Sequence, residues 1–155
     1  MSNELNNKKL AFIEKMSLKM EENGHPRIAG EILGWLMICS PAHQSFQDIT
    51  STLNVSKASV SNMTRFLIQI GLIEKVRLQG NRHIYYQVKR GAWKDLLNSQ
   101  LNQVDEMKKL SEEGLKIVAE EDKNDEARLK EMNAFYSFIS AELPEIVDRF
   151  NNDKD

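Results

Sequence analysis

The chain has 155 residues, a length that suits one ordinary domain or a small domain with a helical extension. Its hydrophobic content of 41% and charged content of 28% are normal for a globular protein, and no apolar run approaches the ~18 residues of a membrane span. A single cysteine excludes an intramolecular disulfide framework. Because the first ten residues contain no apolar segment of a secretory signal, we expect a cytoplasmic protein without a membrane partner.

The net charge of −2 conceals an uneven distribution along the chain. Between Ile49 and Lys94 there are eight bases and one acid, Glu74, so this segment carries +7 and the remainder carries −9. A basic segment in an acidic chain can present a positive face to a polyanion. An ordinary solvated charged surface is the alternative interpretation.

Two helices are expected in the first 40 residues. Apolar residues at helical spacing predict the first from Asn3 to Glu22, which Gly24 and Pro26 end. The second, from about Ile28 to Cys39, is nearly apolar along its centre, and we expect it to be buried.

A turn and a third helix follow. The sequence SPAHQS, residues 40–45, predicts the turn. Ser45 is expected to cap the third helix, with Asp48 at the capping-box position. Ile49 and Leu53 then form the inner face of this helix.

The next helix has two chemically different faces. Asn54 lies where the chain must turn sharply, since asparagine tolerates the left-handed conformation. Ser56 is the expected N-cap of a helix that runs to Ile70, where Gly71 stops it. An apolar face comprises Val60, Met63, Leu67 and Ile70. Small, hydrogen-bonding and basic side chains occupy the opposite face: Ala58, Ser61, Asn62, Arg65 and Gln69.

After this helix the hydrophobic period changes from about 3.6 to about 2 residues. Two strands are predicted, from Leu72 to Leu78 and from Arg82 to Val88. The dipeptide Gly80–Asn81 between them suits a tight primed turn. Three helices followed by a hairpin make the winged helix-turn-helix arrangement, so we predict a mainly α fold with a small β-hairpin wing.

From Ala92 onward the chain is helical and acidic. An apolar stripe continues to Val118, the polar segment from Glu120 to Asp125 predicts a bend, and a last helix follows. Pro144 predicts a kink or a restart of that helix. The apolar period is not a sustained heptad, which favours bundle packing over a long coiled coil.

The outward face of the predicted recognition helix suits the DNA major groove. Arg65 can donate two hydrogen bonds to a guanine and Asn62 can pair with an adenine. Ser61 can serve a base or a phosphate, and the Ala58 methyl can contact a thymine methyl.

Other residues are better placed for the DNA backbone. Arg82 at the hairpin tip can enter the minor groove or contact its phosphates. Lys75 and Arg77 share one strand face and are expected to neutralise phosphates. Three residues near the start of the recognition helix are also expected to contact phosphates: Ser56, Lys57 and Ser59.

The segment from Gly24 to Val88 resembles the winged-helix domain of GbsR-type regulators in the MarR group. The likeness rests on LNVSKASVSN, GLIEKV, GNRHIYY and the helix after Pro26–Arg27. It implies a homodimeric transcription regulator on double-stranded DNA at a pseudo-palindromic operator. Such regulators are often repressors and are often controlled by a small-molecule effector.

Three parts are therefore expected. Residues 1–24 form a helix that contributes to a dimer body, residues 25–90 the winged helix-turn-helix domain, and residues 91–155 a helical dimerisation region. The terminal helices carry more apolar surface than a small winged domain can cover, and a homodimer would bury it. Dimeric helix-turn-helix proteins place their two recognition helices roughly 34 Å apart, one turn of DNA.

Several aromatic residues are candidates for an effector pocket, although such residues are more often part of a core. They are Trp35, Trp93, Phe135 and Tyr136, with Phe138 nearby. Cys39 has two interpretations, a small buried residue or a redox sensor. The histidines have no ligand partners at metal spacing, and no catalytic set or glycine-rich phosphate loop occurs, so we predict no metal, no cofactor and no enzyme activity.

A winged-helix adapter that binds protein rather than DNA is the competing hypothesis. An adapter should carry a hydrophobic or acidic face on its recognition helix. The predicted face instead carries Ser61, Asn62 and Arg65, which favours DNA.

Overall fold

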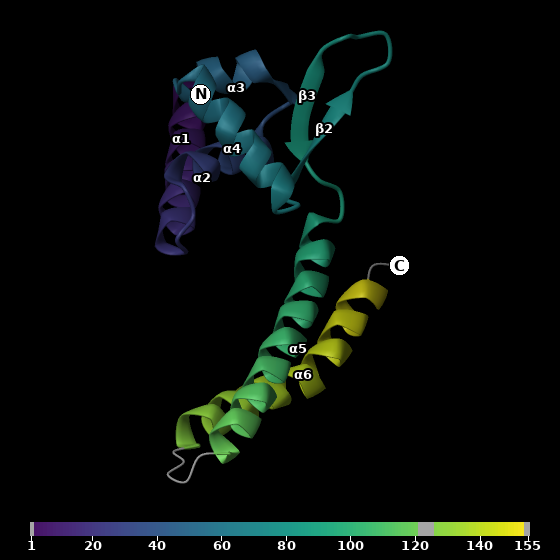
Figure 1. The fold of residues 1–155 in the computed structure, drawn as a ribbon. Helices are drawn as coiled ribbons and strands as arrows, with labels where there is room; N and C mark the ends of the chain where they lie inside the picture. Colours follow the sequence, from purple (N-terminus) through teal and green to yellow (C-terminus); the bar gives the residue numbers. More distant parts are fainter. Residues whose placement is uncertain (1, 121–125, 154–155) are drawn as a thin grey trace. The chain divides into compact units, whose positions relative to one another are not determined.

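The computed structural model describes residues 2–120 and 126–153 (Figure 1). Within these residues the chain forms six α-helices and a small three-stranded antiparallel sheet, which confirms the mainly α fold with a β wing. The chain divides into two compact units between Ala92 and Trp93. Each unit is described by itself below.

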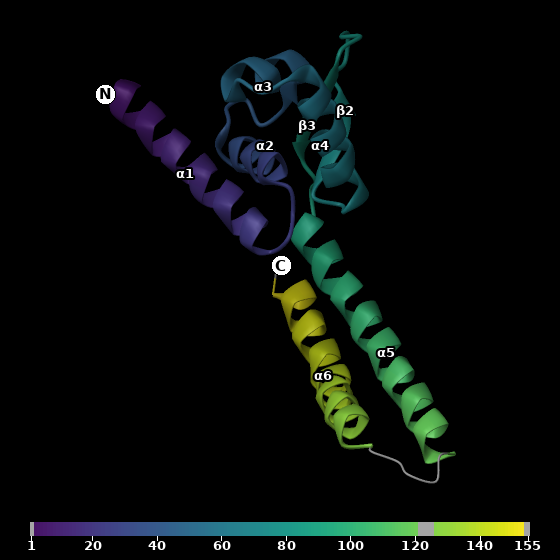
Figure 2. The same ribbon diagram turned by 60° about the vertical axis from the view of Figure 1, so that its left-hand side comes forward.

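The first unit is built around α2, Arg27–Ile38, which lies between α1, Ser2–Glu22, and the two other helices of this unit (Figure 2). As its apolar sequence predicts, α2 supplies much of the core. The buried hydrophobic cluster comprises Ala29, Ile32, Leu33, Leu36, Ile49, Val60, Leu67, Leu72, Ile73, Tyr86 and Ala92.

Helix α1 packs on α2 through small residues. A Cβ atom on Gly30 would lie 2.6 Å from the Cα atom of Ser17 and 2.8 Å from the Met16 carbonyl oxygen. Ser17 is fully buried, and its hydroxyl donates a hydrogen bond to the Arg27 carbonyl at 3.2 Å. The two backbones therefore touch, and α1 belongs to the same compact unit as the winged-helix elements. Its contribution to a dimer body stays a prediction.

The helix-turn-helix consists of α3, Phe46–Leu53, and α4, Lys57–Gln69. The predicted capping box is present, because the Ser45 hydroxyl accepts from the Asp48 N–H at 3.1 Å and an Asp48 carboxylate oxygen accepts from the Ser45 N–H at 2.9 Å. Asn54 adopts the left-handed conformation with φ 51° and ψ 44°. The Ser56 hydroxyl accepts from the Ser59 N–H at 3.1 Å, so both predicted N-caps are confirmed.

The buried face of α4 differs from the prediction at its end. Val60 and Leu67 are fully buried and Met63 packs against the core, as expected. Ile70, however, is 38% exposed, because α4 ends at Gln69 and the chain leaves the helix there. Thr64 is buried instead, with its hydroxyl donating to the Val60 carbonyl at 2.8 Å, which satisfies the polar group inside the core.

The sheet has one strand that the sequence did not predict. Its strands are β1, Gln44–Ser45, β2, Ile73–Arg77, and β3, Ile84–Val88, in the order β1-β3-β2. Strand β1 falls in the segment expected to be only a turn. Two residues are too few to show an alternating pattern, and their strand character comes from pairing with Tyr85 and Tyr86 of β3.

The turn of the wing is longer than the predicted two-residue hairpin. Arg77 pairs with Ile84, which leaves a six-residue loop over residues 78–83. Within it the Asn81 N–H donates to the Leu78 carbonyl at 3.0 Å, and Gly80 has φ +78°. A positive φ at the third position of a four-residue turn defines a type II turn. The Gly80–Asn81 dipeptide thus forms a turn inside a larger loop.

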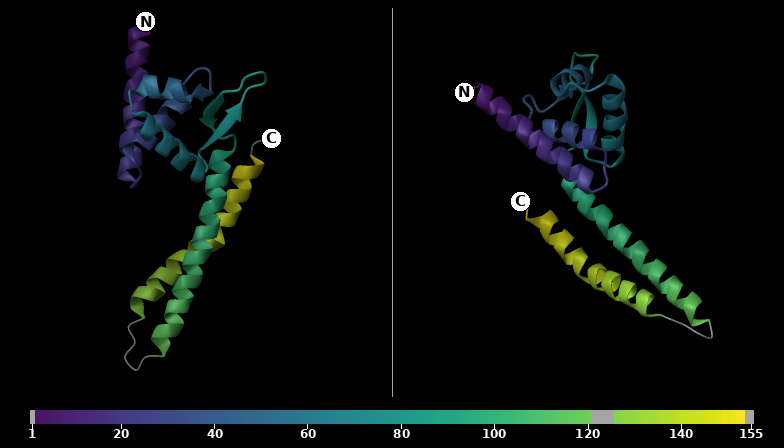
Figure 3. Two further views of the ribbon diagram at one scale, coloured as in Figure 1. Left: turned by 45° about the horizontal axis from the view of Figure 1, so that its top comes forward. Right: turned by 90° about the vertical axis from the view of Figure 1, so that its left-hand side faces the viewer.

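The second unit is a pair of helices, α5, Ala92–Ala119, and α6, Ala127–Asn152, which lie side by side (Figure 3). Polar contacts join them. The Asn133 amide donates to the Ser111 hydroxyl at 2.9 Å, and the Ser140 hydroxyl donates to the Asp105 carboxylate at 2.6 Å. Helix α6 continues through Pro144, so it does not restart there. The bend predicted for residues 120–125 falls almost entirely on residues 121–125, outside the described residues.

The contact between α1 and α2 predicts the effect of enlarging Gly30. Gly30→Ala places a methyl group against backbone atoms, which cannot rotate away, and we expect a loss of about 1–3 kcal/mol in the free energy of unfolding. Gly34→Ala is the matched control, because its closest contacts would be longer, 3.1 Å to the Met16 side chain and 3.2 Å to the Cα atom of Ile13. Urea unfolding of both variants tests whether Gly30→Ala loses more unfolding free energy than Gly34→Ala. Equal losses would contradict this expectation.

The capping box makes stability depend on pH. Hydrogen bonds from the Ser45 hydroxyl, and then from its backbone N–H, lower the pKa of the Asp48 carboxyl. The folded pKa lies below the unfolded value of about 3.9, so this stabilisation is present above that pH and is lost as the pH falls through the folded pKa.

We therefore expect Asp48→Asn to lower the free energy of unfolding at pH ~7 and to lower it less near pH ~3. Ser45→Ala should cost about 0.5–2 kcal/mol at neutral pH, through loss of the N-cap. Urea unfolding of the two variants and the wild type along a pH series measures both effects. An Asp48→Asn loss that does not change with pH would show that the carboxylate contributes nothing through its charge.

Candidate nucleic-acid interface

Helix α4 exposes the residues that the sequence assigned to base contacts. Asn62, Arg65 and Ala58 are exposed, and Ser61 is half-buried. The opposite face is held against the core by Val60 and, two helical turns later on the same face, by Leu67, both of which are fully buried. The helix is thus fixed on one side and presents amide, guanidinium and hydroxyl groups on the other.

The start of α4 is more constrained than the sequence suggested. Lys57 is exposed. The Ser56 hydroxyl donates to the Ser59 hydroxyl at 2.8 Å while it accepts from the Ser59 N–H. Because phosphate oxygens only accept hydrogen bonds, a serine whose hydroxyl proton is already engaged is a weaker phosphate ligand. Lys57 is therefore a stronger predicted phosphate contact than Ser56.

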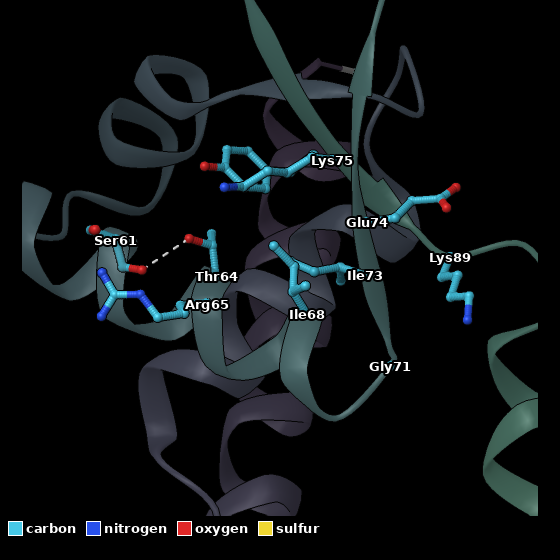
Figure 4. A pocket seen from close by; sticks show the side chains of 10 residues that line it. Ser61, Thr64, Arg65, Ile68, Gly71, Ile73, Glu74, Lys75 and Lys89 are labelled. Carbon is cyan, nitrogen blue, oxygen red and sulfur yellow. Dashed lines mark hydrogen bonds between the residues drawn. The ribbon is translucent and has the colours of Figure 1, made fainter.

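A hollow of about 460 Å³ lies between α4 and the sheet and brings three predicted residues together (Figure 4). Arg65 and Ser61 line it from α4, and Lys75 lines it from β2. Glu74 also lines the hollow, although Figure 4 shows its side chain directed to the other side of the strand from Lys75, as alternation along a strand requires. The Gln87 amide donates to the Glu74 carboxylate at 2.9 Å, so this acid is engaged with β3.

The wing carries the other predicted bases. Arg77 is exposed at the end of β2, two residues after Lys75 and on the same strand face. Arg82 is exposed in the loop over residues 78–83. The structure therefore places positive side chains along the wing as well as on the recognition helix.

The outer face of α3 adds candidates that the sequence analysis missed. Gln47, Thr50 and Ser51 line a hollow of about 350 Å³ together with Lys57 of α4. The Ser51 hydroxyl already donates to the Gln47 carbonyl at 2.7 Å, so the exposed Gln47 amide is the better donor to a phosphate. The sequence contained one signal for these residues, since polar positions on the third helix lie opposite the inward-facing Ile49.

The predicted effector aromatics are divided between the two units. Trp35 is half-buried in the first, where its indole N–H donates to the Gln44 side chain at 3.3 Å and the Lys9 ammonium lies 5.7 Å from the ring centroid. It lines a hollow of about 270 Å³ between α1, α2 and α3. The second unit contains the other three: Trp93, Phe135 and Tyr136. Phe135 and Tyr136 meet edge to face, with ring centroids 5.0 Å apart.

Cys39 lies just after α2 and is half-buried. Its sulfur is 3.6 Å from the Leu36 carbonyl and 3.6 Å from the Ala42 carbonyl. Burial raises the pKa of the Cys39 thiol, which favours the unreactive protonated form. This environment supports the structural interpretation of Cys39 over the redox sensor.

Residues 2–120 and 126–153 contain no group of three or more histidine, cysteine or acidic side chains that could hold a metal ion. Across those same ranges, no helix has the length and apolar character needed to cross a membrane.

The comparisons with known proteins agree on one group. A family model described as MmpR5-like MarR family transcriptional regulator matches residues 91–153. The HTH-type transcriptional regulator MmpR5 of Mycobacterium tuberculosis (strain ATCC 25618 / H37Rv) is 27% identical over 142 residues, which are 92% of this chain and 86% of that protein. A crystal structure described as a transcriptional regulator is 26% identical, with a TM-score of 0.77, and the match covers 93% of this chain and 98% of that one.

These matches refine the expected family. The family model covers α5 and α6, where the GbsR resemblance had not extended. The GbsR subtype is not confirmed, since the relatives are described as MmpR5-like. The family is one of transcriptional regulators and not of enzymes. The chain is a winged helix-turn-helix transcriptional regulator that is similar, over most of its length, to regulators of the MarR family.

Proposed function

We propose that this regulator binds a pseudo-palindromic operator as a homodimer, represses transcription there, and responds to a small-molecule effector in the cytoplasm. The observation that carries the DNA-binding surface is the exposed face of α4 with Asn62 and Arg65 beside the basic wing. An adapter would need an apolar or acidic face at this position. The charge of +7 between Ile49 and Lys94 favours a polyanionic partner.

The residues divide into two roles on the DNA. Asn62 and Arg65, with Ser61 and Ala58, read base edges in the major groove. Backbone contacts come from the outer face of α3 and from the wing, and each phosphate that is neutralised adds about 0.9 to the salt dependence of binding. The proposed phosphate contacts are Gln47, Ser56, Lys57, Ser59, Lys75, Arg77 and Arg82.

Exposed apolar side chains on the terminal helices support the homodimer. On α5, Leu110 is 55% exposed and Ile117 58%, and on α6, Phe135 is 57% exposed and Phe138 65%. Large exposed apolar side chains on adjacent helices are costly in water and mark an interaction surface. A second copy of the same chain is the partner that two-fold recognition of DNA requires.

For the effector, Trp35 is the candidate that lines a hollow within one compact unit. Its ring offers an apolar plane, while Lys9 and Asn6 offer polar groups at the same hollow. Trp93, Phe135 and Tyr136 are the candidates in the second unit. Repression is the expected outcome if the operator overlaps the promoter that the protein controls.

Arg65→Ala is expected to weaken binding to the operator by about 1–3 kcal/mol and to relax sequence preference at one base pair. Lys57→Ala should weaken binding to every duplex and lower the salt slope by about 0.9. Lys19→Ala is the matched control, because Lys19 is an exposed base on α1 that pairs with Glu22.

Fluorescence anisotropy measures these effects on DNA from upstream of the protein's own gene and on a scrambled duplex. A preference for the native duplex of about 1,000-fold or more would support sequence-specific recognition. Binding to neither duplex at low salt would reject the DNA-binding surface and favour the adapter.

Phe138→Glu is expected to shift the protein from dimer to monomer, because a buried charge at an apolar interface is costly. Met37→Glu on α2 is the control, since Met37 is 43% exposed outside the terminal helices. Sedimentation velocity over a range of concentrations gives the mass of each variant. A wild type that stays monomeric at micromolar concentration, or a Phe138→Glu variant that stays dimeric, would contradict the proposed interface.

A further inference from the structure

The loop of the wing is held by one side chain. Both ends of the Asn81 amide are engaged: its oxygen accepts from the His83 N–H at 2.9 Å, and its nitrogen donates to the Tyr85 hydroxyl at 2.8 Å. The His83 N–H is a donor and can bond only to the amide oxygen of Asn81. The amide nitrogen is therefore the atom that faces the Tyr85 hydroxyl. The side chain therefore bridges the loop to β3.

These contacts surround Arg82 in the sequence. Arg82 and His83 are exposed, whereas Asn81 is half-buried. The backbone before Arg82 is held by the turn bond from Asn81 to Leu78, and the backbone after it by the bond from His83 to the Asn81 side chain. Arg82 is thus a solvent-exposed side chain on a backbone segment that is held on both sides.

Tyr85 connects this loop to the rest of the first unit. In the sheet it pairs with Val76 of β2 and with Ser45 of β1. Its ring meets that of His43 edge to face, with centroids 5.2 Å apart and planes at 87°. Because Tyr85 is held from two strands and from the segment before β1, its hydroxyl is a firm anchor for the Asn81 amide.

We propose that Asn81 is a positioning residue for DNA binding, which holds the wing loop on Tyr85 so that Arg82 is presented to the DNA in one conformation. This inference rests on the proposed DNA contact of Arg82. Without the Asn81 amide, the loop would sample many conformations, and DNA binding would have to order it at a cost in affinity. Asn81 itself need not touch the DNA.

The test is a double-mutant cycle on the full-length protein, with operator affinity measured by fluorescence anisotropy at several salt concentrations. Asn81→Ala is expected to weaken binding about three- to tenfold and to lower the salt slope by about 0.9, as Arg82→Ala does. The double variant should bind no more weakly than Arg82→Ala alone. A purely structural role would not move the salt slope.

Two further variants sharpen the test. Tyr85→Phe removes only the acceptor hydroxyl and keeps the ring against His43, so it should weaken binding in the same direction as Asn81→Ala. Gln79→Ala alters an exposed neighbour in the same loop and should bind like the wild type. Thermal unfolding midpoints of all of these variants are measured alongside, so that a loss of affinity is not mistaken for a loss of folding.

Wild-type affinity of Asn81→Ala, alongside a weakened Arg82→Ala, would overturn the positioning role and leave the wing contact intact. Losses that simply add in the double variant would show that Asn81 acts elsewhere. Wild-type affinity of Arg82→Ala would instead reject the wing contact in the proposed function, and the positioning role with it.

Discussion

The burial of one face of α4 is the constraint on which the DNA-binding surface depends. Val60 and Leu67 are fully buried against a core that α2 dominates, and the Thr64 hydroxyl is satisfied within the helix. A helix held in this way cannot rotate without exposing apolar surface, at about 25 cal/mol per Å². The outward direction of Asn62 and Arg65 is therefore set by what the opposite face packs against.

The core that holds α4 is itself set by close packing of α1 on α2. Gly30 allows the backbone of α2 to touch that of α1 at Ser17, and the Ser17 hydroxyl binds the Arg27 carbonyl at the start of α2. Close backbone contact fixes helices more firmly than side-chain packing alone, because backbones cannot change rotamer. The sheet then covers another side of this core through Ile73 and Tyr86.

The second unit distributes polar and apolar groups differently. Ser111 is fully buried and bonded to Asn133, and Asp105 accepts from Ser140, so hydrogen bonds contribute to the contact between α5 and α6. Large apolar side chains such as Phe138 face outward instead. Exposed apolar side chains of this size on neighbouring helices are typical of a surface that a partner covers.

The sequence by itself determined the local features of this protein. The capping box at Ser45, the left-handed Asn54 and the N-cap at Ser56 were predictable, because each depends on residues no more than four positions apart. The amphipathic pattern of α4 likewise predicted the side that carries Arg65. Only the tertiary structure decided the pairing of β1 with β3 and the register that leaves a six-residue wing loop. It alone brought Arg65 and Lys75 to one hollow, because these features depend on contacts between distant segments, for which a local pattern contains no signal.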